Sequence, residues 1–195
     1  QYVLLGSGFD TFPYRQPDWA KRMTIFEVDR PEVIEEKQKR LSQSGIDVPD
    51  NVNFIGADLA EENWIKQLLS HPDFSPKAKT MCSLLGLVYY LTREAFSALV
   101  QSLSILPEGS GVVFDYPNQL SGKLPALAHG ASAPMMAFYS ERDLTALLSA
   151  QGFRICEHLS PLEAAEQFFR LHQLANPDST LTAPPHVSYC LSVRK

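Results

Sequence analysis

A glycine turn followed by acidic side chains is the feature of this sequence best suited to bind a ligand. Gly6 and Gly8 follow a short apolar stretch, and a ligand can approach the main chain closely where glycine removes the side chain. Glu27 and Asp29 end the next apolar stretch, about twenty residues later, where carboxylates can accept hydrogen bonds from ribose hydroxyls. They stand at alternate positions, so both would face the same way. The spacing indicates a nucleotide site, although Gly-x-Gly alone also occurs in ordinary strand-to-helix turns.

The residue after this turn bears on which nucleotide could bind. Thr11 stands where the dinucleotide-binding fingerprint has its third glycine, which argues against a pyrophosphate seated on a helix amino terminus. A nucleoside ligand without a diphosphate, such as S-adenosylmethionine, fits better. A nicotinamide-dependent oxidoreductase is the less favoured alternative.

The elements that would position these residues alternate between strands and helices, as in an α/β fold with a mostly parallel sheet. The carboxyl ends of parallel strands meet at one edge of the sheet, where the ligand crevice forms. The expected strands are Tyr2–Leu5, 23–26 with the acidic triplet after it, 52–55, one within 80–91, 112–114, 153–156 and 186–193. Helices are expected over 31–44, 61–70, the stretch after Thr92, 144–150 and 161–174, and a helical connector is expected between the first two strands.

Three blocks in this order, at residues 4–15, 26–31 and 56–59, resemble the leucine carboxyl methyltransferase-like family of S-adenosylmethionine-dependent O-methyltransferases. The resemblance extends from residue 1 to about residue 116. It implies a Rossmann-like class I methyltransferase fold, with a mostly parallel seven-stranded sheet, helices on both faces and an antiparallel last strand. It also implies S-adenosylmethionine as cofactor. The cofactor-binding residues would be Gly6, Ser7, Gly8, Asp10, Glu27, Asp29, Asp58, Leu59 and Leu85.

Within the resembling family, the Asp-Leu pair that matches Asp58 and Leu59 contacts the adenine, and the carboxylate accepts from its exocyclic amine. Asp58 could instead cap the following helix. The family usually carries a glutamate before the residue that matches Gly86, and this chain has Leu85 there. Loss of one hydrogen bond to a charged group costs about 1.5–3 kcal/mol, or roughly ten- to a hundredfold in affinity. Either affinity is weaker or another residue substitutes.

The sequence identifies the residues around the methyl acceptor less clearly than those around the cofactor. Asp115 and Tyr116 end the fifth expected strand and are candidate substrate-side residues, with loop capping as the alternative. Arg15 could pair with an acidic substrate or with the cofactor carboxylate, or could bond Asp10. A carboxylate acceptor needs little acid–base help, whereas a hydroxyl acceptor needs a base, for which Asp115 or His129 are candidates. Residues 117–139 are expected to form a lid that sets specificity, and about 160–180 a second insertion with Phe168, Phe169 and Leu171 facing the protein.

Composition narrows the class of protein further. The chain has 195 residues, which suits a single domain, and its net charge of −5 offers no basic surface for nucleic acid. The three cysteines and five histidines show no metal-ligand spacing, and the sequence carries no apparent signal peptide or membrane span. We expect a cytoplasmic monomer or dimer that acts on a small-molecule or carboxylate-bearing acceptor and lacks the family's N-terminal segment. A weakened relative that binds cofactor or a partner is the alternative.

Overall fold

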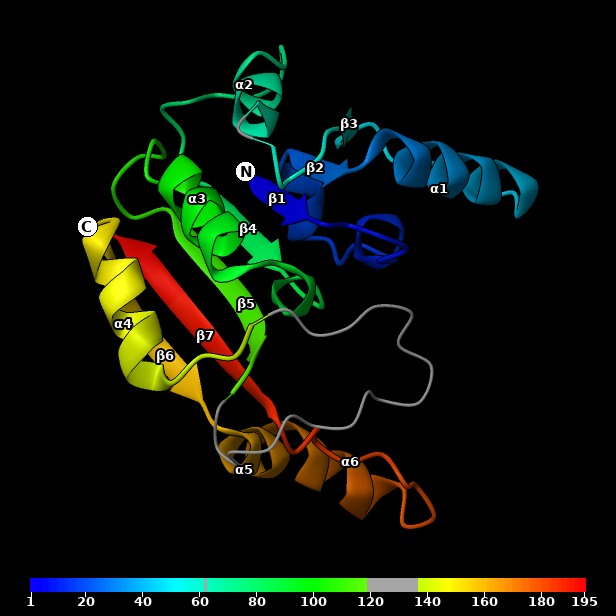
Figure 1. The fold of residues 1–195 in the computed structure, drawn as a ribbon. Helices are drawn as coiled ribbons and strands as arrows, with labels where there is room; N and C mark the ends of the chain where they lie inside the picture. Colours follow the sequence, from blue (N-terminus) through cyan, green and yellow to red (C-terminus); the bar gives the residue numbers. More distant parts are fainter. Residues whose placement is uncertain (62, 119–136) are drawn as a thin grey trace.

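The computed structural model describes residues 1–61, 63–118 and 137–195. Its centre is a seven-stranded sheet in the order β3-β2-β1-β4-β5-β7-β6 (Figure 1). Strands β1 to β5 run parallel, and β7 is antiparallel to both of its neighbours, β5 and β6. The predicted sheet, including its antiparallel last strand, is confirmed. The strands are β1 (Tyr2–Leu5), β2 (Ile25–Asp29), β3 (Val52–Gly56), β4 (Met81–Leu84), β5 (Gly111–Pro117), β6 (Phe153–Leu159) and β7 (Val187–Arg194).

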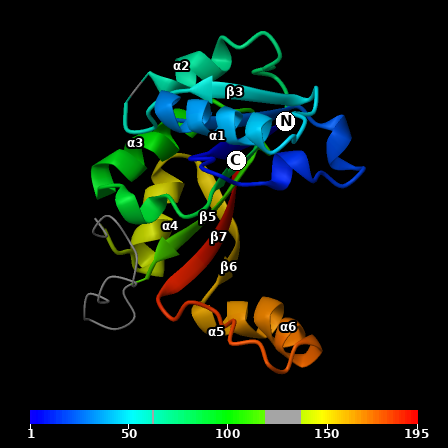
Figure 2. The same ribbon diagram turned by 90° about the vertical axis from the view of Figure 1, so that its right-hand side faces the viewer.

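Helices cover both faces of this sheet, as predicted. Figure 2 shows α3 (Arg93–Leu103) and α4 (Glu141–Ala150) together on one side. The short helix α2 (Trp64–Leu69) contributes to the same core as these two. Helix α1 (Pro31–Gln43) packs on the opposite face, against β2 and β3. The remaining short helices are η1 (Phe12–Tyr14), η2 (Ala20–Arg22), η3 (Val88–Tyr90), α5 (Pro161–Ala164), the π-helical η4 (Ala165–Phe169) and α6 (Arg170–Ala175).

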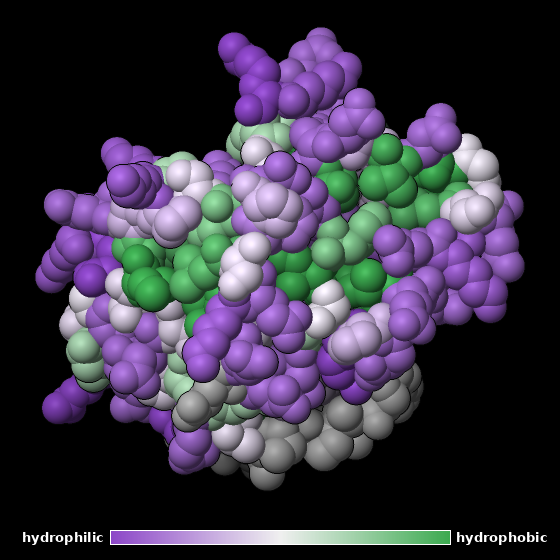
Figure 3. All heavy atoms as spheres, turned by 90° about the horizontal axis from the view of Figure 1, so that it is seen from above, coloured by the Kyte–Doolittle hydropathy of each residue, from purple (hydrophilic) through white to green (hydrophobic). Residues whose placement is uncertain are grey.

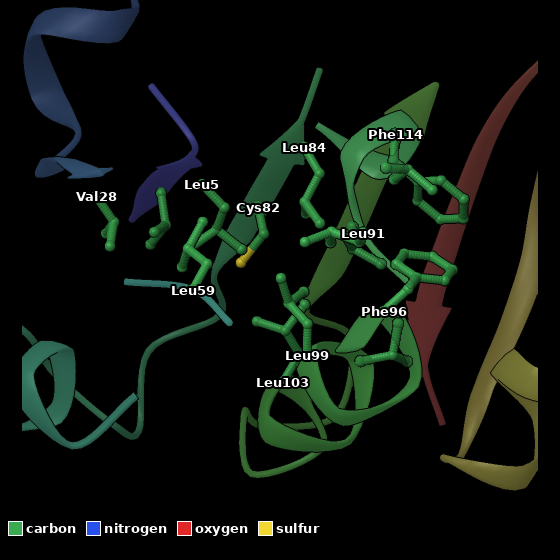
Figure 4. Close-up of a cluster of buried hydrophobic side chains, with 14 of the residues drawn as sticks. Leu5, Val28, Leu59, Cys82, Leu84, Leu91, Phe96, Leu99, Leu103 and Phe114 are labelled. Carbon is green, nitrogen blue, oxygen red and sulfur yellow. The ribbon is translucent and has the colours of Figure 1, made fainter. Parts of the chain in front are cut away.

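The main hydrophobic core lies between the sheet and the α3 side. Alternation along β1 sends Val3 and Leu5 into this core and Leu4 into a smaller cluster on the α1 side. Phe96 and Leu99 of α3 are almost fully buried against the strands (Figure 4). β1 therefore buries apolar side chains on both faces, as is typical of inner parallel strands, whereas the neighbouring β2 buries a charged side chain, Glu27.

Two expectations about helices are wrong. The connection between β1 and β2 contains only the short turns η1 and η2, because Pro13 and Pro17 remove backbone donors that a continuous helix would need. Residues 161–175 are helical as expected, through α5, η4 and α6, but the expected packing is wrong: Phe168 and Leu171 are 55% and 70% exposed, and Phe169 is only partly buried. Burial on this insertion is confined to its first turn, at Pro161 and Ala164.

The predicted lid begins where β5 ends. Asn118 forms an isolated bridge with Tyr139, so the two ends of this segment lie side by side. Residues 119–136, including His129, lie outside the described residues, and the lid stays a prediction. Seen from above, the surface is mostly hydrophilic with hydrophobic side chains gathered in places (Figure 3). No helix in the described part of the chain is long and apolar enough to cross a bilayer.

Candidate active site

The glycine turn after β1 is held against the end of β2 by its own backbone. The amides of Gly6 and Ser7 donate to the Val28 carbonyl at 2.8 and 3.2 Å. Gly6 and Gly8 have φ of +70° and +45°, in the left-handed region that favours glycine. A Cβ on Gly6 would lie 3.1 Å from Leu87 Cδ2, whereas a Cβ on Gly8 would meet no atom within 4 Å. The turn therefore presents open backbone at Gly8.

Asp29 lies beside this open backbone. Its Oδ2 accepts the Gly8 amide at 2.7 Å, and its Oδ1 accepts the Arg30 amide at 2.8 Å. The side chain is only partly buried, and each carboxylate oxygen can accept a further hydrogen bond. The predicted pairing of the glycine turn with the acidic end of β2 is thus present in the structure.

A pocket of about 340 Å³ opens between the turn after β1 and the turn after β4. The glycines Gly6, Gly8 and Gly86 are part of its wall, and Ser7 Oγ in that wall is buried near the Glu27 carboxylate. Asp10, also in the wall, uses Oδ1 to accept the Phe12 amide at 2.8 Å. The described residues that line the pocket are Leu4, Leu5, Gly6, Ser7, Gly8, Phe9, Asp10, Ser83, Leu85 and Gly86.

Asp115 holds the Gly86 side of the pocket wall in place from outside the lining. Its Oδ1 accepts the Gly86 amide at 2.7 Å, and the Tyr89 hydroxyl donates to its Oδ2 at 3.2 Å. Burial raises the pKa of Asp115, although these donors oppose the shift, and burial together with the Asp115 charge raises the pKa of Tyr89. Leu85, which precedes Gly86, is 50% exposed and lines the pocket. Asp115 therefore supports the pocket wall, with both oxygens engaged.

Other predicted residues lie outside this lining. Asp58 follows β3, and its Oδ1 accepts the Ala60 amide at 2.9 Å, while Leu59 is buried in the core. The Ala57 amide donates to the Asp29 carbonyl at 2.7 Å, so the Asp58 loop joins the end of β2. The structure places Asp58 at the same edge of the sheet as the glycine turn. A contact between Asp58 and a ligand stays a prediction.

Glu27 and Asp29 occupy different environments despite their alternate positions on β2. Glu27 is fully buried, and its two oxygens contact the Tyr14 hydroxyl and Lys37 Nζ. Burial raises the pKa of Glu27, and these partners act in the opposite direction. The sequence analysis did not pair these residues. Lys37 was the residue that could have revealed this ion pair, because a charged side chain stands there between Ile34 and Leu41 on the buried side of α1.

The remaining acceptor-side candidates are dispersed. Tyr116 points to the opposite face from Asp115, where it is 1% exposed and its hydroxyl lies 2.6 Å from His158 Nε2. Burial raises its pKa to about 12. Arg15 lines a separate groove of about 410 Å³ between residues 9–15 and α1, and its Nε donates to Thr11 Oγ1 at 2.9 Å. The described residues contain no group of three or more His, Cys, Asp or Glu side chains arranged to hold a metal ion.

Comparison with solved structures defines the class of fold. The whole chain superposes on 73% of "a putative methyltransferase from Thermobifida fusca YX" with a TM-score of 0.67 and 17% identity. It also superposes on 73% of magnesium protoporphyrin IX methyltransferase (ChlM) from Synechocystis PCC 6803, solved with bound SAH, with a TM-score of 0.59 and 14% identity. The fold is that of the class I S-adenosylmethionine-dependent methyltransferases.

Sequence comparison then defines the family. Residues 1–104 match the model of the leucine carboxyl methyltransferase family, so the chain belongs to that family. "Putative S-adenosyl-L-methionine-dependent methyltransferase YktD" of Bacillus subtilis (strain 168) is 32% identical over 206 residues. That alignment includes all of this chain and 66% of YktD, so the chain spans just under two thirds of the length of this relative.

Proposed function

We propose that this protein binds S-adenosylmethionine in the pocket between the β1 and β4 turns and transfers its methyl group to an oxygen atom of a small-molecule acceptor. The observation that carries the proposal is the pocket wall itself. It offers open backbone at Gly8, and the Asp29 carboxylate, just outside the lining, accepts the amide of that same residue. Family membership supports the same ligand.

Different residues of the site bind different parts of the cofactor in this proposal. Asp29 accepts hydrogen bonds from the ribose hydroxyls with the lone pairs that Gly8 and Arg30 leave free. Asp58 accepts from the adenine amine through Oδ2, which has no partner within the described residues. Ser7 and the backbone of the two turns contact the part of the ligand between them. The bound cofactor supplies a methyl group on a positively charged sulfur.

A carboxylate suits this pocket better than a hydroxyl as the acceptor. Asp10 is the titratable side chain among the described lining residues, and one of its oxygens already accepts a backbone amide. Asp115 lies behind the lining, where its oxygens accept from Gly86 and Tyr89, so it is poorly placed to act as a base in the pocket. A carboxylate is already ionised near neutral pH and needs orientation close to the methyl group more than proton removal.

Calorimetric titration with S-adenosylhomocysteine tests the cofactor site. We expect one binding site in the wild-type chain and a loss of roughly ten- to a hundredfold in affinity for Asp29→Ala, because a charge-assisted hydrogen bond is removed. Asp47→Ala, at an exposed aspartate outside the pocket, is the matched control and should bind like the wild type. A folded wild-type chain that gives no binding heat, supported by the same result in equilibrium dialysis, would refute the proposal.

The acceptor class has its own test, because methyl esters and methyl ethers differ in stability to base. The chain is incubated with methyl-labelled S-adenosylmethionine and a panel of small carboxylic acids and phenols. A carboxylate acceptor gives a product that releases labelled methanol in mild alkali, whereas a phenolic acceptor gives a product that keeps its label. Labelling of the phenols alone would contradict the carboxylate assignment and leave methyl transfer to oxygen standing.

A cofactor-binding relative with weakened catalysis is the second candidate. The observation that favours it is Leu85, an apolar, half-exposed side chain in the pocket wall where the family usually places a glutamate. This candidate predicts S-adenosylhomocysteine binding without methyl transfer to any member of the panel.

A further inference from the structure

A buried carboxylate connects three elements directly beneath the glycine turn. Glu27 on β2 is fully buried, and Lys37 on α1 is 3% exposed. Lys37 Nζ forms an ion pair with Glu27 Oε2, and the hydroxyl of Tyr14, in η1, donates to Oε1. One side chain of β2 thereby holds both the helix that follows β2 and the connection that precedes it.

Stability alone is a poor reason for this arrangement. Removing two charges from water carries a desolvation cost that their attraction offsets only in part, and apolar pairs of similar size are often as stable or more stable. Lys37 lies on a stripe of α1 that is otherwise apolar, with Ile34 before it and Leu41 after it. An apolar residue would fit the pattern of this helix equally well.

The ion pair does, however, act on the part of β2 that holds the glycine turn. The carbonyl of Val28, the next residue, accepts the amides of Gly6 and Ser7. The carboxylate of Asp29, one residue further, accepts the amide of Gly8. The Ser7 hydroxyl also lies near enough to Glu27 to lower the pKa of that carboxyl. Three consecutive residues of β2 therefore interact with three consecutive residues of the turn.

We propose that Glu27, Lys37 and Tyr14 form a positioning cluster for the cofactor site, and that Glu27 supports the site without contacting the cofactor. Its carboxylate fixes α1 and η1 relative to β2, which holds Asp29 and the glycine turn in the arrangement that receives a nucleoside. This assigns a different role to each of the two carboxylates of β2. It rests on the proposed cofactor binding, because its effect is measured on that binding.

A double-mutant cycle separates positioning from simple stabilisation. Glu27→Leu and Lys37→Met each leave one buried charge without its partner, so each should lower the urea midpoint of unfolding strongly. The double variant removes both charges, and its midpoint should return toward that of the wild type. Its affinity for S-adenosylhomocysteine should nevertheless stay weaker on the order of tenfold, as for other preorganised sites that lose their supporting groups.

A second variant decides the question if the double variant does not fold. Tyr14→Phe removes one hydroxyl from the cluster and keeps the ring, so it should fold and bind S-adenosylhomocysteine more weakly than the wild type. Tyr139→Phe, which removes a buried hydroxyl within the core on the other face of the sheet, is the matched control and should bind normally. Fluorescence or calorimetric titration at one temperature gives the affinities of the wild type and of these two variants.

The outcomes distinguish this inference from the proposed function. A wild-type chain that does not bind S-adenosylhomocysteine overturns the proposed function and with it the role of the cluster. A wild-type chain that binds, together with a stable double variant of equal affinity, overturns the positioning role alone. Where the double variant does not fold, an unchanged affinity in Tyr14→Phe overturns the positioning role.

Discussion

Leu85 stands in the pocket wall at the position where the family resemblance leads us to expect a glutamate. Its side chain is half exposed in the wall that also contains Ser7 and Gly8, where a carboxylate could reach the same ligand. We expect Leu85→Glu to raise the affinity for S-adenosylmethionine by roughly ten- to a hundredfold, because one hydrogen bond to a charged group is gained. Calorimetric titration measures the change. Leu85→Gln, which has similar size without the charge, is the control, and an unchanged affinity in Leu85→Glu would count against the assigned pocket.

Asp115 gives a pH-dependent prediction. Burial raises its pKa above the ordinary value of 3.8, so folding favours the protonated carboxyl. The stability that this group contributes is therefore fully present below its unfolded pKa and is lost as the pH rises through its raised folded pKa. The difference in unfolding free energy, wild type minus Asp115→Asn, should accordingly fall as the pH rises from about 4 through the raised folded pKa. Urea titrations at several pH values measure it.

The exposed aspartate Asp47 provides the reference for this measurement. The pH dependence common to the whole chain cancels in each difference between wild type and variant. A difference for Asp115→Asn that rises with pH, or one that matches Asp47→Asn at every pH, would contradict the assigned effect of burial.

The amino terminus of α3 shows how a single element is fixed. Thr92 Oγ1 accepts the Ala95 amide at 3.1 Å and caps the helix, whose buried side chains include Phe96 and Leu99. Thr92→Ala should lower the free energy of unfolding by about 1 kcal/mol, since one backbone donor loses its partner. Denaturant unfolding gives the value. Thr92→Ser keeps the accepting oxygen and should lose much less, and equal losses in the two variants would show that the cap is not the cause.

Elements were predictable where local pattern and tertiary packing agree. The strand ends at Leu5 and Asp29 followed from short apolar runs bounded by glycine or acidic residues, and the helix after Pro31 followed from its apolar stripe. The 161–174 region had an apolar pattern as well, yet its Leu171 is exposed, because periodicity cannot show whether a partner surface is present.

The candidate site was predictable only in part for a similar reason. The glycine turn and Asp29 are adjacent through one strand pair, so their spacing in sequence was sufficient. The burial of Glu27 depends on Lys37 and Tyr14, which come from two other elements. The support of Gly86 by Asp115 depends on the pairing of β4 with β5. Such contacts arise from the tertiary fold: local sequence can show that Lys37 interrupts an apolar stripe, but it does not identify the partner.

At the level of the whole chain, the parallel strand ends bring residues from the turns after β1 and β4 together into one pocket. Arg15 and Tyr116 lie away from that pocket, in a groove against α1 and in the core on the α3 side. The pocket is therefore separate from Arg15 and Tyr116, whereas Asp115, the third residue expected on the acceptor side, supports its wall.

The most direct test of the account is a crystal structure of the chain grown with S-adenosylhomocysteine at a concentration well above its measured dissociation constant. We predict density for the ligand between the Gly6–Gly8 turn and Gly86, with the ribose hydroxyls within hydrogen-bond distance of Asp29. Density for the ligand elsewhere, such as the groove lined by Arg40 and Ile46, would contradict the assigned site. Crystals without ligand density under these conditions would contradict it as well.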